Sequence, residues 1–220
     1  MTPRASLIVA LALVTCLLHA QESYDRTFVV NDTRDSPDTN LNDGVPDANM
    51  DVGQQVTLRA ALMQAGALGG RTLITFARNM TVTNLNGQQF VPGNITIRGL
   101  GTEATVIDAD RRGRVLTVGS IEDRTVYSVR LENLTLRNGV VVADTSGLVA
   151  NAGIANYWSE LALSNVVMQS NYAAGDLRYA HHGAIGSTGP RLTLEDCVFA
   201  NNGADAEGGA VGCPQGGALT

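Results

Sequence analysis

The stretch LTLEDCVFANNGADAEGGAVG (residues 192–212) follows a pattern that the chain has already used twice, in LALSNVVMQSN (residues 161–171) and LENLTLRNG (residues 131–139). Each copy sets alternating apolar residues before an Asn or Asp, then further apolar residues, then Asn. A Gly-flanked aliphatic residue accompanies the later copies, in AGIAN, HGAIG and GGAVG. Repetition of this kind is typical of a solenoid, in which each repeat buries its apolar side against its neighbours.

Aligning the copies predicts which side chains are equivalent in successive coils. We expect alternating apolar residues to point inward, Asn or Asp to turn the chain at a corner, and Gly to permit a bend where a Cβ would clash. Stacked Asn side chains are expected to form a hydrogen-bonded ladder. The predicted columns are Leu131, Leu161 and Leu192; Asn133, Asn165 and Asp196; Leu134, Val166 and Cys197; Leu136, Met168 and Phe199; Asn138, Asn171 and Asn202; and Ile154, Ile185 and Val211.

The earlier half of the chain shows a shorter interval. The triplets ITF at Ile74, ITI at Ile95 and LTV at Leu116 are 21 residues apart each time, and each alternates apolar, Thr, apolar. Such triplets indicate half-buried strands, and we expect each to pair in parallel with the next, about 4.8 Å along the axis. The predicted fold is an all-β solenoid, a parallel β-helix. A β-sandwich also uses short strands, but it gives no reason for regular columns.

One segment departs from the strand pattern. The stretch VTLRAALMQAG places four apolar residues on one helical face, namely Leu58, Ala61, Leu62 and Ala65. Thr57 is a candidate N-cap, and Gly66 stands where the helix is expected to stop. We therefore predict a short helix over about residues 57–65, which covers the open end of the first coil.

The start of the chain predicts export. Residues 1–20 combine a basic start, an apolar run over residues 7–18 and a small residue, Ala20, before polar Gln21, as in a secretory signal peptide. Cys16 leaves a lipoprotein signal as the alternative, although Thr15 fits that poorly. We expect a signal peptide over 1–20, an N-terminal strand and acidic Asp/Asn-rich loop over 21–55, and a capping helix with the β-helix over 56–220. The last repeat starts but does not finish, so we expect the β-helix to be incomplete at its C-terminus.

Composition excludes some classes of function. The chain has 15 basic residues, all Arg, against 21 acidic residues, so nucleic acid and anionic membranes are poor candidates for partners. Beyond the signal segment, the cysteines are Cys197 and Cys213. In an oxidising compartment these two are candidates for a disulfide, and two buried thiols that act as small hydrophobes are the alternative.

Several motifs resemble a family of bacterial secreted proteins. TFVVNDTRDSPD, NDGVPDAN, VTLRAAL, LITF, NITIRGLG, TVIDAD, GRVLTV and LENLTLRNG resemble right-handed, pectin-lyase-like parallel β-helix proteins that open with a CSLREA-type segment. The resemblance implies a right-handed coil and a secreted or surface location, and it says little about activity. The chain departs from the family by having Val56 for Cys, Ala60 for Glu, and Pro46 where another Cys is common. This excludes an N-terminal disulfide.

The acidic segment over residues 31–51 contains a candidate metal site. Its alternating oxygen-bearing side chains are like the first ligands of a calcium loop, but the EF-hand spacing fails, because Gly44 is seventh and Asn49 is twelfth from Asp38. A looser calcium site is one prediction, and a solvated turn-rich loop is the other. The candidate ligands are Asp38, Asn40, Asn42, Asp43 and Asp47.

A second candidate site lies in the connection that varies most between repeats. Variable insertions on one side of a solenoid often form its binding face. The candidate ligand-binding residues there are Asp176, Arg178, Tyr179, His181 and His182. An exposed loop without a ligand is the alternative, and adjacent histidines do not point the same way along a strand, which argues against a metal held by the pair.

The stretch VIDADRRGRVLTV supplies weak candidates for catalysis. Carboxylates and arginines near a groove suit glycan chemistry, since polysaccharide lyases need a base and charge neutralisation, and glycoside hydrolases need a carboxylate pair. No recognisable hydrolase signature accompanies them, and the absence of Lys excludes lysine-dependent lyase schemes. A surface Asp–Arg cluster at a coil corner is the alternative. The candidates are Asp108, Asp110, Arg111, Arg112 and Arg114.

Three functions follow as expectations. The first is an exported surface or extracellular scaffold that binds glycans or cell-envelope partners without catalysis, with calcium as the one candidate cofactor. The second is a polysaccharide lyase or glycoside hydrolase on the same fold, because fold does not determine function. The third is the N-terminal part of a larger adhesin or autotransporter passenger.

Overall fold

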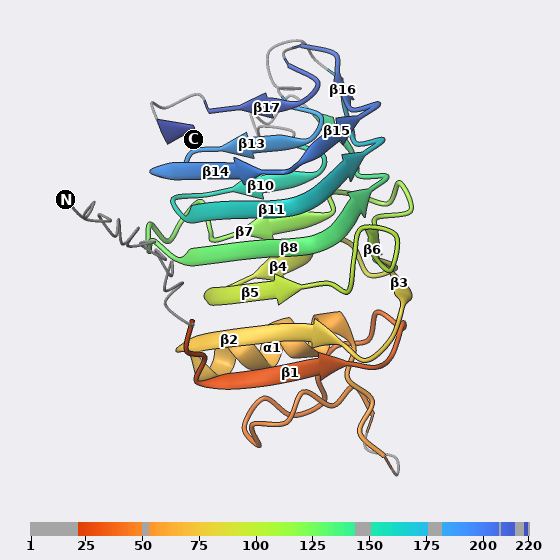
Figure 1. The fold of residues 1–220 in the computed structure, drawn as a ribbon, viewed down its shortest axis with the longest axis vertical. Coiled ribbons are helices and arrows are strands. Elements are labelled where there is room, and N and C mark those ends of the chain that lie inside the picture. Colours follow the sequence, from red (N-terminus) through yellow and green to blue (C-terminus); the bar gives the residue numbers. More distant parts are fainter. Residues whose placement is uncertain are drawn as a thin grey trace, which may run out of the picture.

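The chain folds as a parallel β-helix with one short helix. The computed structural model describes residues 22–49, 53–143, 151–175, 182–206, 208–213 and 218–219, so the predicted signal peptide lies outside the described residues. Every strand pair in this part of the chain is parallel. Figure 1 shows the coils stacked along the long axis, from β1 and helix α1 at one end to the C-terminal strands at the other.

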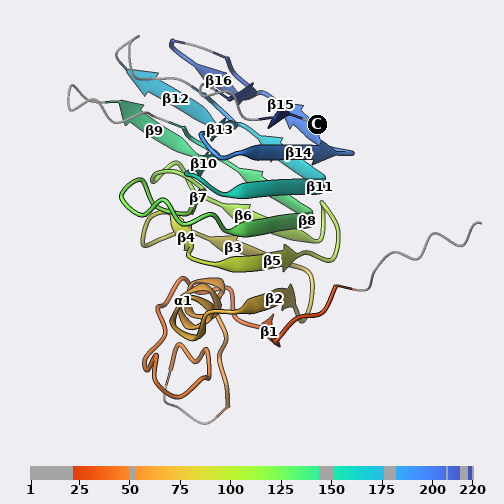
Figure 2. The same cartoon turned by 90° about the vertical axis from the view of Figure 1, so that its left-hand side faces the viewer.

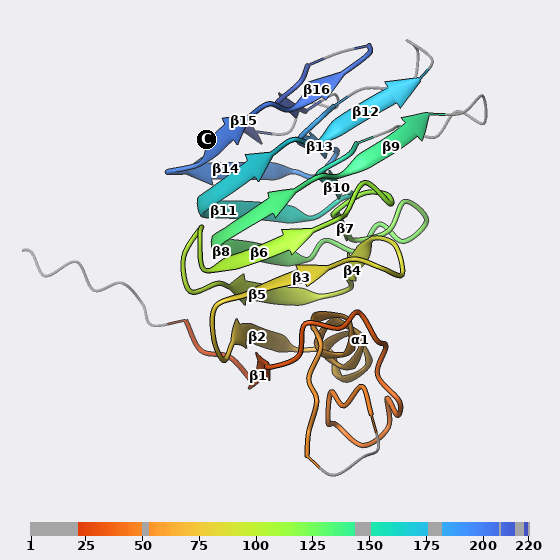
Figure 3. The same cartoon turned by 90° about the vertical axis from the view of Figure 1, so that its right-hand side faces the viewer.

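The strands form three sheets. The ten-stranded sheet contains β1 (Arg26–Val30), β2 (Arg71–Phe76), β3 (Met80–Thr83), β5 (Asn94–Arg98), β6 (Thr105–Asp108), β8 (Ser128–Arg137), β11 (Glu160–Gln169), β14 (Arg191–Glu195), β15 (Val198–Ala200) and β18 (Ala218–Leu219). The five-stranded sheet contains β4 (Gln89–Val91), β7 (Leu116–Val118), β10 (Ile154–Asn156), β13 (Ile185–Ser187) and β17 (Val211–Gly212). The third contains β9 (Val140–Ala143), β12 (Tyr172–Gly175) and β16 (Gly203–Ala204), and Figure 3 shows it towards the C-terminal end of the stack.

Inward aliphatic ladders build the core. Ile97 pairs with Leu131, Leu131 with Leu163, and Leu163 with Leu194, and the first three are almost completely buried. In the five-stranded sheet, Ile154 pairs with Leu116 on one side and Ile185 on the other. In Figure 1 the strands β5, β8, β11 and β14 lie in front of β4, β7, β10 and β13, so the ladders of the two sheets face each other across the core. The predicted aliphatic column of Ile154, Ile185 and Val211 is confirmed.

The predicted corner column is also confirmed. Asn133, Asn165 and Asp196 all adopt positive φ, between 50° and 55°, a region that Asn and Asp tolerate better than most residues. Asn165 Nδ2 donates to Asn133 Oδ1 over 2.9 Å, which is one rung of the expected ladder. The strands β8 and β11 bend at these residues without losing their pairing partners.

The register corrects one member of each of two predicted columns, while the predicted pairing of Leu161 with Leu192 is confirmed. Leu131 pairs with Leu163, not with Leu161, and Leu161 pairs with Val129 instead. Leu131 stands two residues before its corner Asn, whereas Leu161 stands four residues before its own, so the two are not equivalent. The corner Asn fixes the register, and the next inward pairs, Leu134 with Val166 and Leu136 with Met168, are as predicted. The closing Asn column is confirmed for Asn171 and Asn202 and wrong for Asn138. Asn171 Nδ2 donates to Asn202 Oδ1 over 3.0 Å, whereas the Asn138 side chain binds Asp108.

The 21-residue interval of the earlier half is not the coil length. Ile74 pairs with Ile97 rather than with Ile95, and Leu116 belongs to β7 in the five-stranded sheet, where it pairs with Gln89. Every strand of a β-helix alternates in the same way, so equal spacing of similar triplets does not distinguish one sheet from the next. The prediction that the three triplets stack on one another was wrong for this physical reason.

Helix α1 (Leu58–Leu68) covers the first coil, as predicted. Thr57 is its N-cap, and the Thr57 side chain accepts a hydrogen bond from Ala60 N over 3.0 Å. The predicted end at Gly66 was wrong, because the helix continues to Leu68 and Gly69 follows with φ of 62°. Figure 2 shows α1 directly beneath β4, so that the helix extends the face of the five-stranded sheet.

Glycines permit the tight approach of neighbouring coils. A Cβ added at Gly153 would lie 2.3 Å from the Ala184 carbonyl oxygen and 2.6 Å from Met168 Cε. The carbonyl cannot move without breaking its hydrogen bond to Ile154 N, which joins the two coils. The expected role of the Gly beside the repeated aliphatic is therefore confirmed at this position.

Cys197 and Cys213 are separate thiols in the structure and not a disulfide. Both are half-buried and pack against the edge of the core, and burial raises the pKa of each thiol. Cys197 Sγ donates to the Glu195 carbonyl oxygen over 3.3 Å. Both thiols pack as small hydrophobic side chains, which was the alternative prediction.

Candidate functional site: an arginine groove beside the five-stranded sheet

A cavity of about 400 Å³ lies on the outer face of the five-stranded sheet, which is large enough for a small ligand. Its floor is formed around the ends of β4 and β7, and the 119–127 connection between β7 and β8 forms one wall. We call it the arginine groove. Its lining residues are Gln88, Phe90, Val91, Pro92, Arg114, Thr117, Gly119, Ser120, Ile121, Asp123, Tyr127 and Tyr157.

Arg114 is the charged residue at the centre of the groove. Its Nε donates to the Asn151 carbonyl oxygen over 2.5 Å, and its Nη1 donates to Gln88 Oε1 over 2.8 Å and Thr117 Oγ1 over 3.2 Å. Thr117 Oγ1 also donates to Gln88 Oε1 over 3.0 Å. These neutral acceptors fix the guanidinium plane against the sheet.

No carboxylate compensates the charge of Arg114 within the described part of the chain. The ion pairs among these residues involve other arginines. Burial lowers the pKa of the guanidinium, and the nearby Tyr157 opposes that shift only in part. The Nη2 group makes no hydrogen bond to a described residue and retains solvent access. A desolvated cation with free donors is the chemistry that recognises a carboxylate or sulfate.

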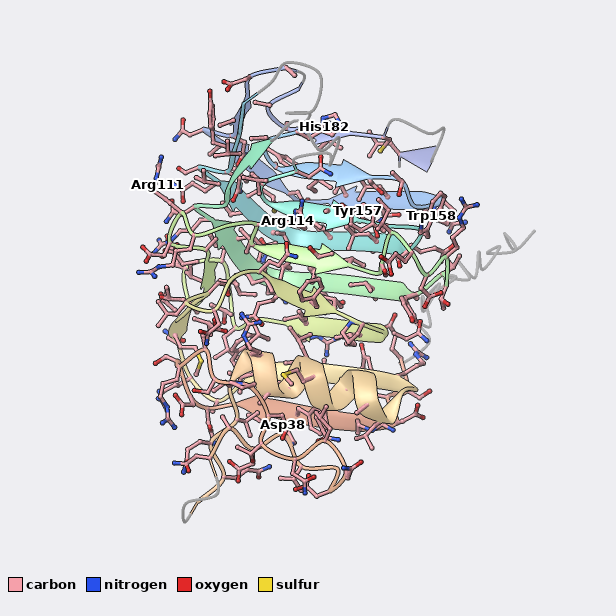
Figure 4. All side chains as sticks on the ribbon, turned by 180° about the vertical axis from the view of Figure 1, so that it is seen from behind. Asp38, Arg111, Arg114, Tyr157, Trp158 and His182 are labelled. Atoms are coloured by element: carbon pink, nitrogen blue, oxygen red, sulfur yellow. The ribbon has the colours of Figure 1, made fainter. Side chains whose placement is uncertain are left out.

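Aromatic side chains flank this cation. Phe90 projects outward from β4 with 54% of its surface exposed, and Tyr127 and Tyr157 line the same cavity. Figure 4 shows Arg114 and Tyr157 on the same face of the molecule, with α1 below them. Flat aromatic faces and a fixed cation together suit a sugar ring that carries an acidic group.

The rim beyond Tyr157 is held rigidly. Trp158 has φ of 58°, which is unusual for a bulky residue and costs backbone energy. The Arg124 guanidinium lies over the Trp158 ring, 4.8 Å from its centroid, an attractive cation–π geometry. This contact joins the 119–127 connection to the turn after β10 and so fixes one wall of the groove.

Asp123 is the one carboxylate among the residues that line the groove. Hydrogen bonds from Thr125, with a further one from Tyr127, lower the pKa of Asp123, so it is ionised at neutral pH. Its oxygen accepts from Thr125 Oγ1 over 2.6 Å. A glycoside hydrolase needs two carboxylates on opposite sides of the scissile bond, and the lining residues supply one.

The predicted catalytic cluster does not converge on one site. Of its five members only Arg114 lines the groove, whereas Figure 4 shows Arg111 at the left edge of the molecule and Arg114 near the middle of the face. Asp110 and Arg111 adopt positive φ, 50° and 59°, and this turn sends the chain from β6 in one sheet to β7 in another. Asp110 pairs with Arg112 on the surface over 2.9 Å. The single stretch of sequence therefore contributes to two separate surfaces.

Asp108 has a structural role at its corner. It is buried, and it accepts from Arg137 Nε over 2.7 Å and from Asn138 Nδ2 over 2.9 Å. Burial opposes ionisation, but hydrogen bonds from the Asp110 backbone, Asn138 and Arg137 outweigh it, so the pKa of Asp108 is lowered. The carboxylate therefore links β6 to the end of β8.

The acidic N-terminal loop uses most of its side-chain oxygens in turns. Asp38 Oδ1 accepts from Asn40 N, Asn40 Oδ1 from Asn42 N, and Asp43 Oδ1 from Val45 N. Across the described residues, no group of three or more His, Cys, Asp or Glu side chains is arranged to hold a metal ion. Calcium binding by Asp38, Asn40, Asn42, Asp43 and Asp47 stays a prediction, and the hydrogen bonds are those of a turn-rich loop.

Replacing Asp38 by Asn is expected to increase the free energy of unfolding at pH 7 by up to about 1 kcal/mol in the presence of a chelator. Asp38 is 8% exposed with Oδ2 unpaired, and burial raises its pKa, with Asp43 and Asp47 adding to the shift. Because the folded-state pKa is raised, the difference should vanish below the ordinary Asp pKa, where both states are protonated. Urea unfolding of the two proteins from pH 3 to 7 measures this.

The same pair of proteins tests calcium. Added calcium should stabilise the wild-type protein and not Asp38→Asn if the loop is a calcium site. A variant less stable than wild type at pH 7 in chelator would contradict the account of Asp38 as a destabilising buried charge.

The second predicted ligand site lies mostly beyond what the structure describes. Asp176, Arg178, Tyr179 and His181 lie outside the described residues. His182 is 5% exposed, and its ring lies where a Cβ of Gly212 would be, with Cε1 1.9 Å from that position. His182 thus packs against the five-stranded sheet, and the expectation that it lies in an exposed loop was wrong.

The aromatic members of the groove were not predicted from the sequence. Phe90, Tyr127 and Tyr157 come from three different coils, and nothing in their local sequence links them to Arg114. One usable signal was present, because Phe90 occupies the outward position between Gln89 and Val91, both buried. An outward Phe in a three-residue strand is a candidate for ligand contact.

The described residues contain no helix long and apolar enough to cross a membrane. Comparison of the chain with protein-family models, with curated proteins and with solved structures finds no match.

Proposed function

We propose that this protein is an exported β-helical scaffold, secreted or held at the cell surface, that binds acidic glycans of a cell envelope or extracellular matrix through the arginine groove. The observation that carries the proposal is the desolvated Arg114, which has no carboxylate partner among the described residues. A uronate carboxylate or a sulfate would supply the missing charge. The signal-peptide features of residues 1–20 support export.

The shape and lining of the groove support a sugar ligand. The cavity is open and shallow, with Phe90, Tyr127 and Tyr157 at its sides, and aromatic faces pack against the apolar faces of pyranose rings. The polar groups Gln88, Thr117 and Ser120 line the same surface and offer hydrogen bonds to ring hydroxyls. The motif resemblance to pectin-lyase-like, CSLREA-type secreted β-helix proteins is consistent with this proposal.

A polysaccharide lyase on this groove is the second candidate. Arg114 would neutralise a uronate carboxylate, and the hydroxyl of Tyr157 is close enough to affect the charge of Arg114. A lyase also needs a base at the α-proton. Asp123 is the one carboxylate in the lining, and hydrogen bonds from Thr125 lower its pKa, which makes it a weaker base. We therefore favour binding over catalysis. The stack of coils would serve equally well within a longer adhesin or autotransporter passenger.

The test is retention of the exported protein, beginning at Gln21, on immobilised polygalacturonate and alginate, with dextran as the neutral control. We expect binding to the polyuronates, no binding to dextran, and loss of binding as salt rises to 0.5 M, since the interaction is one of charge. Incubation with soluble polyuronate, followed by absorbance at 232 nm, detects unsaturated products. Equal binding to dextran would refute the proposal, and product formation would replace it with the lyase.

A further inference from the structure

A second hollow adjoins the arginine groove on the side of the helix. It has a volume of about 380 Å³ and lies between α1 and β4. Its walls are largely apolar, with Leu41, Leu62 and Met63 on one side and Phe90 and Pro92 on the other. Arg59 also borders it, but both guanidinium nitrogens that face Asp35 are paired, at 2.8 and 2.9 Å. The hollow therefore presents a largely apolar surface, and the charge of Arg59 beside it is paired with Asp35.

The two hollows adjoin at Phe90 and Pro92, which line both. Phe90 is half exposed. It separates the arginine groove, which contains Arg114, from the apolar hollow beside α1. Figure 4 shows α1 and Arg114 on the same face, so one ligand can lie across both hollows.

The apolar hollow is built into the fold. Gly66 of α1 meets Pro92 so closely that an added Cβ would lie 2.6 Å from Pro92 Cγ, which sets the helix against the strand and leaves the hollow above the contact. Leu41 is held over the helix because its carbonyl oxygen accepts from Gln64 Nε2 over 3.2 Å. Leu41 still leaves 39% of its surface exposed, and a ligand would cover this surface.

We propose that the preferred ligand is an acidic sugar that carries an apolar acyl or aryl substituent. The carboxylate binds Arg114, the sugar ring packs on Phe90, and the substituent fills the hollow between α1 and β4. This inference rests on the proposed function, because it uses the same Arg114 contact. It adds a class of ligand, a substituted acidic glycan, that charge alone would not select.

The experiment compares three small probes by ligand-observed NMR titration: glucuronate, 4-nitrophenyl β-D-glucuronide and 4-nitrophenyl β-D-glucoside. On the wild-type protein we expect the aryl glucuronide to bind at least about tenfold more tightly than glucuronate, because the ring buries apolar surface. The aryl glucoside should bind much more weakly than the aryl glucuronide, since it lacks the carboxylate.

Met63→Gln should remove most of the aryl advantage and leave the affinity for glucuronate unchanged. Met63→Leu is the matched control and should keep the advantage, because it keeps an apolar side chain of similar volume. Arg114→Gln should weaken both acidic probes. Thermal unfolding of each variant shows that its fold is intact.

Each failure has a different meaning. If glucuronate binds but the aryl group adds nothing, or if Met63→Gln weakens both acidic probes equally, the substituent site is refuted and the arginine groove survives. If neither acidic probe binds, or if Arg114→Gln changes neither, the proposed function is refuted together with this inference.

Discussion

Asp35→Ala should lower the free energy of unfolding by about 3–5 kcal/mol, the largest loss expected of any single substitution outside the aliphatic core. Asp35 is 3% exposed and binds Arg59 through both carboxylate oxygens, at 2.8 and 2.9 Å. It also accepts from Asn86 N over 2.6 Å and from Gln89 Nε2 over 2.7 Å. Removing it leaves the Arg59 cation without its counter-charge, with only the Gly87 and Gln88 carbonyls as acceptors. It also leaves Asn86 N without an acceptor, where the N-terminal loop, α1 and β4 meet.

Urea unfolding followed by circular dichroism measures this loss. The control is Asp110→Asn, which breaks a surface pair whose Asp and Arg side chains are 52% and 56% exposed and keeps a residue type that tolerates the positive φ at this position. We expect a change within about 0.5 kcal/mol. The double variant Asp35→Leu with Arg59→Met should recover part of the loss, because both charges then leave the interior. A loss below 1 kcal/mol for Asp35→Ala would show that the loop is not anchored through this carboxylate.

The fold can be predicted from the sequence because each feature of the repeat depends on a short local pattern of residues. The Asn133 and Asn165 corners, the inward pairs that follow them and the capping helix each depend on residues close together in the chain, and the structure confirms all three. The register in which the strands pair is harder to predict from the sequence. Leu131 and Leu161 are both inward-facing leucines, and which partner each takes depends on its distance from the corner Asn, two residues for Leu131 and four for Leu161.

The groove could be predicted only in part, because its lining residues are far apart in the sequence and come together only when the coils stack. Arg114 was a candidate on account of its neighbours Asp108 and Asp110, yet those neighbours point to another surface. Its true companions, Gln88 and Tyr157, belong to the coils before and after it. The ion pair between Asp35 and Arg59 could not be predicted for the same reason, since the two residues are 24 positions apart in the sequence.

Arg114→Met should separate binding from stability. We expect polyuronate affinity to fall about 100-fold, which corresponds to the loss of one or two charge-assisted hydrogen bonds. The free energy of unfolding should change by less than about 1 kcal/mol, because the lost bonds to Gln88, Thr117 and the Asn151 carbonyl are offset by removal of a buried charge that has no counter-ion among the described residues.

The control for this variant is Arg112→Met, which removes the same charge from an exposed position paired with Asp110 and should leave polyuronate affinity within about twofold. Arg114→Lys should fall between wild type and Arg114→Met, because a lysine restores the charge without the planar fork. If Arg112→Met and Arg114→Met weaken binding equally, attraction is a property of the whole surface and the groove has no special role. If only Arg114 matters and the protein stays folded, the buried cation is retained for the ligand, since it contributes nothing that the fold itself requires.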